Sequence, residues 1–311
     1  MSMAGGLRVG INPPWGLFSE PPEGQRALLS SIADSGIDLV FLADHVSFRG
    51  GEGTDGIVAL AAMSGLEPRL GLSLGVYLLA LRHPMVAARQ IATLAEAAPG
   101  RVTIGVGVGG EDRSEFEVCG VDPTTRGRRT DAALQIVRRL LVGESVTWHD
   151  EFFDLDGARI LSAPKPPVRF VVGGRSKAAL QRAGRLGDGW LAAWCSARRM
   201  AEGIKQVEEA AGDRLAPMPD SWSHGIQLWV GVGTDPAEGR RHVARGLNDF
   251  YKMPFEPFEP YTPAGTAADI AEFLAPYVEA GARTLHLAAV GESRSAEIET
   301  IAEVSRLLKG R

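Results

Sequence analysis

The segment 173–176, Gly-Gly-Arg-Ser, places two glycines, a cation and a hydroxyl group between an apolar run and an amphipathic stretch of helical period. The first N–H groups of a helix have no intrahelical partner and lie at the positive end of its dipole, so they stabilise a bound anion. Gly173 and Gly174 would let a phosphate approach the backbone, Arg175 adds charge, and Ser176 can cap the helix or bond an oxygen. We interpret these residues as candidate phosphate ligands. The alternative is that Ser176 is only a helix cap and Arg175 a solvated residue.

A histidine follows the apolar run 38–44, whose last residue is Asp44. An imidazole exchanges protons near neutral pH, and at the end of a strand it could hydrogen-bond a ring or a substrate. His45 is therefore the candidate catalytic residue, and Asp44 is a candidate cofactor ligand. The alternative is that His45 is structural. Trp194 ends another apolar run and is a further candidate cofactor ligand.

Within and just after the run 102–108, β-branched residues and glycine alternate strictly from Ile104 to Gly109. Successive side chains of a strand point to opposite faces, so Gly105, Gly107 and Gly109 share one bare face. Three glycines on one face indicate that something flat, such as a cofactor, lies close to the backbone. Tight packing inside a narrow barrel is the alternative. The same stretch fits G-x-G-x-x-G, but no clear helix follows it, which disfavours a dinucleotide fold.

The remaining charged and metal-binding residue types give weaker signals. Glu111, Asp112 and Glu115 are interpreted as loop carboxylates rather than as an acid–base pair. The basic run 126–129 opens a helical segment and is interpreted as a solvated or salt-bridged face. The six histidines include no H-E-x-x-H pair and the two cysteines are far apart, so we expect neither a metal site nor a disulfide.

Eight short apolar runs alternate with amphipathic segments along the chain. Strands separated by helices pair in parallel, and nearly continuous apolar strands are buried on both faces. The pattern predicts an α/β fold, specifically a single (β/α)8 TIM-barrel domain over 1–311 with insertion loops, and a doubly wound open sheet is the alternative. The predicted strands are 7–12, 38–44, 70–78, 102–108, 168–174, 189–194, 226–232 and 284–290. The surplus residues fall in three insertions, 110–129, 143–167 and 249–265.

The composition excludes several classes of function. With 45% hydrophobic and 23% charged residues, the chain has the profile of a globular protein, and a net charge of -5 disfavours nucleic-acid binding. No signal peptide and no apolar stretch long enough to span a membrane is evident. We expect a cytoplasmic protein that acts on a small molecule and has neither a nucleic-acid nor a membrane partner.

Several blocks, in order along nearly the whole chain, resemble the luciferase-like family of flavin- or deazaflavin-dependent oxidoreductases, whose fold is a TIM barrel. The blocks are FLADHVSF, LRHPMVAARQIATLAEAAPGRVTIGVGVGG, EFEVCGVDPTTRGRRTDAAL, VVGGRSKAALQRAGRLGDGW and GTAADIAEFLAPYVEAGARTLHLA. The most specific of them contains GG-x-S and R-A-x-R-x-GDGW. The Gly- and Ala-rich composition, with more Arg than Lys, resembles that of actinobacterial proteins, in which the deazaflavin F420 is common.

The resemblance implies a cofactor site and a reaction. The tricyclic ring would stack inside the barrel, with its phosphate at the 173–176 segment and near Trp194. A bulge with a non-prolyl cis peptide, Gly75-Val76, would lie behind the ring, and His45 would lie near the reactive ring carbon. The expected activity is F420-dependent hydride transfer to or from a small organic substrate, by a protein that is often a homodimer.

Three other functions stay open: an FMN-dependent monooxygenase, a non-catalytic flavin-binding protein, and a phosphate-binding barrel enzyme without a redox cofactor. Sugar-phosphate dehydrogenases of the family tend to carry a glutamate directly after the glycines of the fourth strand. Here Gly110 takes that place and Glu111 follows one residue later, which disfavours a sugar phosphate as the substrate. The aromatic loop at 249–265 would either line part of an apolar pocket or pin the loop to the barrel.

Overall fold

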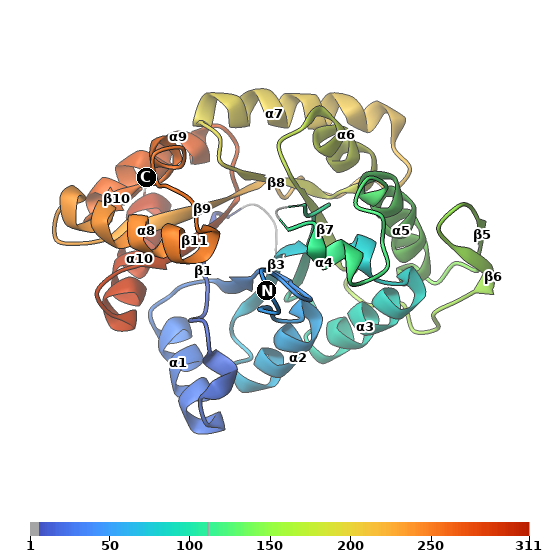
Figure 1. Ribbon diagram of the computed structural model, residues 1–311, viewed down its shortest axis with the longest axis horizontal. Coiled ribbons are helices and arrows are strands. Elements are labelled where there is room, and N and C mark those ends of the chain that lie inside the picture. Colours follow the sequence, from blue (N-terminus) through green and yellow to red (C-terminus); the bar gives the residue numbers. More distant parts are fainter. Residues whose placement is uncertain (1–5, 111, 311) are drawn as a thin grey trace. The chain divides into compact units, whose positions relative to one another are not determined.

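The computed structural model describes residues 6–110 and 112–310. All eight predicted strands are present in it (Figure 1). Their bounds differ from the predicted ones by only a few residues at either end. They are β1 (Arg8–Ile11), β2 (Leu39–Leu42), β3 (Gly71–Tyr77), β4 (Val102–Val106), β7 (Arg169–Gly173), β8 (Gly189–Ala193), β9 (Gly225–Val232) and β11 (Thr284–Val290).

The strands close into a barrel. Hydrogen bonds order the main described sheet as β10-β9-β11-β1-β2-β3-β4-β7-β8, and β9 also pairs with β8. The pairings run parallel, as in the register Arg8↔Thr284 between β1 and β11, and β10 (Ala264–Gly265) is a two-residue addition beside β9. The closing pair leaves no open edge in this ring of eight strands, so the prediction of a (β/α)8 barrel is confirmed and the open-sheet alternative is excluded.

The chain divides into two compact units. The first comprises the chain up to Phe41, Leu191–Gln206 and everything from Ser221 onwards. The second comprises Leu42–Trp190 and Val207–Asp220. All candidate site residues except Trp194 belong to the second unit. A single domain over the whole chain stays a prediction.

Three helices of the second unit, α2, α3 and α6, begin where a side chain satisfies one of their first N–H groups. Asp55 caps α2 by accepting a hydrogen bond from the Val58 N–H, and Ser176 caps α6 in the same way. Arg182 of α6 pairs with Asp131 of α5, at 2.5 Å between Nε and Oδ1, and joins the two helices. The helices are α2 (Gly56–Leu66), α3 (Pro84–Ala97), α4 (Ser114–Glu117), α5 (Arg126–Leu141) and α6 (Lys177–Leu186).

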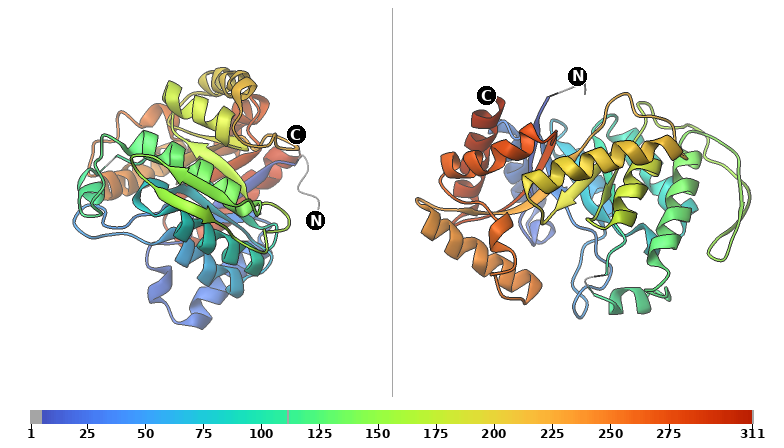
Figure 2. Two further views of the ribbon diagram at one scale, coloured as in Figure 1. Left: turned by 90° about the vertical axis from the view of Figure 1, so that its right-hand side faces the viewer. Right: turned by 90° about the horizontal axis from the view of Figure 1, so that it is seen from above.

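The second insertion contains a hairpin that the sequence analysis did not predict. Strands β5 (Val146–His149) and β6 (Asp154–Ala158) pair antiparallel in a sheet of their own. Phe153 of the hairpin loop packs against α5, where the Arg129 guanidinium lies 4.6 Å from its ring centroid. The segment that carries the hairpin lies beside α5 (Figure 2).

Three helices of the first unit, α8, α9 and α10, also begin with a side-chain cap. Thr266 and Asp269 form a reciprocal capping box at the start of α9, and Ser293 caps α10. The bounds are α1 (Pro22–Asp34), α8 (Pro236–Tyr251), α9 (Ala267–Glu279) and α10 (Arg294–Lys309), while α7 (Ala197–Ala210) continues from the first unit into the second. Within residues 6–110 and 112–310, none of the helices combines the length and apolar composition that crossing a membrane requires.

Candidate functional site

The loop after β2 begins with a buried carboxylate. Asp44 is 1% exposed. Its Oδ1 accepts a hydrogen bond from the Gly56 N–H at 2.9 Å, and its Oδ2 accepts one from the Leu78 N–H at 3.0 Å. Arg82 approaches both oxygens at 2.7 Å. Asp44 therefore joins the β2 loop to the start of α2 and to the segment after β3. Its contact with a cofactor stays a prediction.

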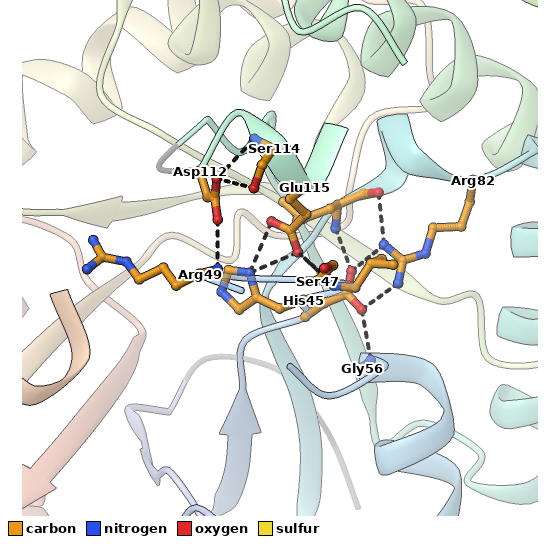
Figure 3. A network of polar contacts seen from close by, with 11 residues as sticks. His45, Ser47, Arg49, Gly56, Arg82, Asp112, Ser114 and Glu115 are labelled. Atoms are coloured by element: carbon orange, nitrogen blue, oxygen red, sulfur yellow. Dashed lines mark hydrogen bonds and ion pairs between the residues drawn. The ribbon is translucent and has the colours of Figure 1, made fainter. Parts of the chain in front are cut away.

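His45 lies against a carboxylate that comes from 70 residues further along the chain (Figure 3). Its Nδ1 is 3.3 Å from both Oε1 and Oε2 of Glu115. The side chains are 11% and 3% exposed, respectively. The Phe48 ring packs beside the imidazole, with centroids 4.2 Å apart. The candidate catalytic histidine is therefore held in a largely buried, hydrogen-bonded position.

The same carboxylate fixes the backbone of the loop. Glu115 Oε1 accepts hydrogen bonds from the Val46 N–H at 2.7 Å and the Ser47 N–H at 3.4 Å. Burial opposes ionisation of Glu115, but the hydrogen bonds from His45 and Val46 outweigh it and hold the pKa of this carboxyl below its ordinary value. The interpretation of Glu115 as a loop carboxylate is therefore corrected, because it lies buried on α4 and bonds the candidate catalytic residue.

Asp112 holds the tip of the same loop. Its Oδ2 accepts a hydrogen bond from the Arg49 N–H at 2.7 Å, and its Oδ1 accepts bonds from the N–H and hydroxyl of Ser114 (Figure 3). Asp112 thus anchors the loop through its backbone at Arg49. Glu111, the third of these acidic residues, lies outside the described residues.

The end of β3 has the bulge that the family resemblance implied. The peptide bond Gly75-Val76 is cis, and the register of β3 against β4 shifts between Leu74 and Tyr77. Val76 is half-buried. The Asp44 N–H donates to the Val76 carbonyl at 3.2 Å, which ties this bulge to the loop that carries His45.

Val76 explains two of the candidate glycines. A Cβ at Gly107 would lie 2.2 Å from Val76 Cγ2, and a Cβ at Gly173 would lie 2.6 Å from Val76 Cγ1. Such approaches do not occur between real atoms, so both positions must lack a side chain for Val76 to fit. Packing of β3 against β4 and β7 accounts for both glycines. Their direct contact with a cofactor stays a prediction.

The rest of the glycine face on and beyond β4 is also filled. A Cβ at Gly105 would lie 2.2 Å from the Leu74 carbonyl oxygen, and one at Gly109 would lie 3.0 Å from atoms of Leu78 and Phe116. The face that looked bare in the sequence is therefore covered by the β3 bulge and α4. Of the two interpretations of this face, the structure favours tight packing. A flat ligand on this side would therefore contact the β3 bulge rather than a row of glycines.

The start of α6 is exposed, as a phosphate site requires. Gly174, Arg175 and Ser176 are all exposed, and Gly174 has a φ of +120°, which disfavours any side chain there. The Gly174 carbonyl accepts a hydrogen bond from Trp190 Nε1 at 2.6 Å, which fixes the turn. Ser176 Oγ accepts a bond from the Ala179 N–H at 3.2 Å, so Ser176 is an N-cap, whether or not it also binds an anion.

Trp194 belongs to the first unit, where it packs among other rings. It follows β8 in a left-handed conformation with φ of +51°, and its ring centroid is 4.7 Å from that of Phe258. Phe258 stacks on Tyr251 at 5.4 Å, and Tyr251 lies 6.1 Å from Trp229 of β9. The aromatic insertion is thus pinned to barrel strands, as one of the two interpretations of this loop proposed.

Comparisons with known proteins agree with the fold and the motifs. The model of the luciferase-like monooxygenase family matches residues 7–293, and the chain belongs to this family. An F420-dependent glucose-6-phosphate dehydrogenase of Beutenbergia cavernae is 34% identical over 191 residues, which are 60% of this chain and 56% of that protein. The chain spans about half the length of the curated relatives it matches.

Two solved structures share the whole fold. An F420-dependent secondary alcohol dehydrogenase in complex with an F420–acetone adduct superposes with a TM-score of 0.81 at 19% identity, covering 97% of this chain and 99% of that one. The oxygenating constituent of 3,6-diketocamphane monooxygenase from Pseudomonas putida, in complex with FMN, gives a TM-score of 0.77 at 15% identity and covers 98% of each chain. At these identities the likeness extends to the fold alone.

Proposed function

We propose that the protein is an F420-dependent oxidoreductase that transfers a hydride between the deazaflavin and a small organic substrate. The observation that carries the proposal is the fixed His45 imidazole in the loop after β2, because reacting groups of barrel enzymes lie at the carboxyl ends of the strands. The names of the F420-dependent relatives support the choice of cofactor. The family match supports an oxidoreductase more broadly.

The residues of the second unit fit such a cofactor. The exposed start of α6 offers backbone N–H groups and the positive end of a helix dipole to a phosphate. The half-buried Val76 side chain at the β3 bulge offers an apolar surface to a ring. When bound, the deazaflavin supplies the hydride chemistry. The protein contributes binding, orientation and proton exchange.

We assign to His45 the exchange of the proton that accompanies hydride transfer. Its Nδ1 faces Glu115, so Nε2 is the ring atom available to exchange a proton with the substrate or to stabilise charge on it. Asp44 joins the start of the loop to the Gly56 N–H at its end, and Glu115 accepts the Val46 N–H beside His45; together they keep this nitrogen in place. Gly75-Val76 and the 173–176 segment would position the ring and the phosphate.

We propose a small organic molecule rather than a sugar phosphate as the substrate. Gly110 stands where sugar-phosphate dehydrogenases of the family tend to have a glutamate.

An FMN-dependent monooxygenase is the second candidate function, because a structure with FMN shares the fold. The test is fluorescence titration of the purified protein with F420 and, separately, with FMN. Tighter binding of F420 is the expected result. Tighter binding of FMN would replace the proposal by a monooxygenase. Binding of neither cofactor would favour a barrel enzyme without a redox group, and binding without any turnover would favour a non-catalytic flavin-binding protein. A homodimer and a cytoplasmic location stay predictions.

A further inference from the structure

The contact between His45 and Glu115 also bears on which nitrogen of the imidazole carries its proton. We propose that Glu115 is a positioning residue that keeps the proton of the neutral His45 ring on Nδ1 and thereby presents Nε2 as the atom that exchanges a proton. The expected effect on turnover rests on the proposed function. The position of the proton on the ring is independent of that function, and it can be measured in the protein without cofactor.

The chemistry of the pair sets the tautomer. An ionised carboxylate only accepts hydrogen bonds, so the ring nitrogen that faces it must carry the hydrogen. Nδ1 lies 3.3 Å from both carboxylate oxygens of Glu115. The hydrogen bonds from His45 and Val46 also keep this carboxyl ionised against the cost of its burial, since they hold its pKa low. Nε2 is then left without a hydrogen in the neutral ring and is a base.

Three further contacts fix the orientation of the ring. The His45 N–H donates to the Thr54 carbonyl at 3.1 Å, which sets the backbone. The Phe48 ring packs on the imidazole. Phe48 is itself placed by backbone hydrogen bonds with Glu52 at 2.7 and 2.8 Å. These contacts therefore hold the imidazole in the orientation in which Nδ1 faces Glu115.

Asp112 provides a matched comparison within the same segment. Like Glu115, it follows β4 and accepts a backbone N–H of the His45 loop at 2.7 Å. Unlike Glu115, it accepts hydrogen bonds from Arg49 and Ser114, and within the described residues none from the His45 ring. Variants at both positions would weaken the anchoring of the loop, whereas only variants at Glu115 would change the tautomer of His45.

The first experiment measures the tautomer by two-bond ¹H–¹⁵N correlation NMR of the histidine rings, without cofactor and near pH 8. His45→Asn assigns the His45 signals. The wild type should show the Nδ1–H pattern. Glu115→Gln should change it to Nε2–H or to a mixture, because the amide can donate to Nδ1, and Asp112→Asn should leave it unchanged. A wild-type ring with its proton on Nε2, or an unchanged pattern in Glu115→Gln, would overturn the proposal.

The second experiment measures F420 affinity and single-turnover hydride transfer in the same variants. Glu115→Gln should slow hydride transfer by about 10²-fold, in the range of general acid–base contributions, while changing the F420 Kd less than about threefold. Asp112→Asn should change both by less than about threefold. An equal loss of hydride-transfer rate in the two variants would show that Glu115 acts only as an anchor of the loop. Failure of the wild type to bind F420 would refute the proposed cofactor while the NMR result for the tautomer still stands.

Discussion

The buried His286 predicts a steep loss of stability in acid. This residue of β11 is 1% exposed, and its ring stacks on Phe41 with centroids 4.4 Å apart. Both of its ring nitrogens are buried and have no hydrogen-bond partner among the described residues. Burial, with a smaller contribution from Arg8, lowers the pKa of His286 from 6.5 to about 3. The imidazole is therefore neutral in the folded protein over the whole range in which the unfolded chain becomes protonated.

The sign and size of the effect follow from linkage. Because the folded pKa is the lower one, the unfolded state binds more protons below pH 6.5, and the free energy of unfolding falls as the pH falls from there toward 3. Between about pH 7 and about pH 4.5 the loss from this residue is about 2.5 kcal/mol, since each pH unit within the window contributes about 1.4 kcal/mol. A second buried histidine, His224, has its pKa lowered to about 4 by burial and by Arg283, and it adds a loss in the same direction.

The perturbation is His286→Leu, which removes the titrating ring and keeps the site apolar. Urea unfolding at about pH 7 and about pH 4.5 gives the free energy of unfolding of the wild type and the variant. The difference between the two pH values should be about 2.5 kcal/mol smaller in the variant than in the wild type. If both proteins lose the same free energy between the two pH values, the neutral buried state assigned to His286 is wrong.

Two further predictions concern the glycine and serine positions of the candidate site. Gly107→Ala should lower the free energy of unfolding by about 1–3 kcal/mol, because the new Cβ would lie 2.2 Å from Val76 Cγ2. Gly65→Ala, in open space on α2, should instead raise it by about 0.5–1 kcal/mol in the same urea assay, and equal effects would contradict the packing argument. Ser176→Ala should lose about 1 kcal/mol of stability and also weaken F420 binding, whereas Ser293→Ala, which removes the equivalent cap of α10, should lose only the stability. Unchanged F420 affinity in Ser176→Ala would move the phosphate away from α6.

The barrel itself could be predicted because its signals are local. Each barrel strand is a short apolar run, the helices between the strands have their own period, several of them have a side-chain cap, and parallel pairing follows from the alternation of strands and helices. The hairpin of β5 and β6 was missed because a strand such as Val146–His149 is too short and too polar to stand out within an insertion. The N-cap role of Ser176 could also be predicted from the sequence, since a cap depends on residues three positions apart.

Local sequence patterns were sufficient to predict the strands and several helix starts, and to identify His45 as the residue with suitable chemistry. The surroundings of these residues depend on contacts between distant parts of the chain. Glu115 reaches His45 across 70 residues, and no local pattern encodes that distance. In the sequence, the absence of a side chain at Gly107 could serve either a ligand or a neighbouring residue. Only the folded chain shows that the Val76 side chain of a neighbouring strand lies against it. Burial and side-chain proximity are properties of the folded chain, because closing the barrel brings the ends of separate strands together.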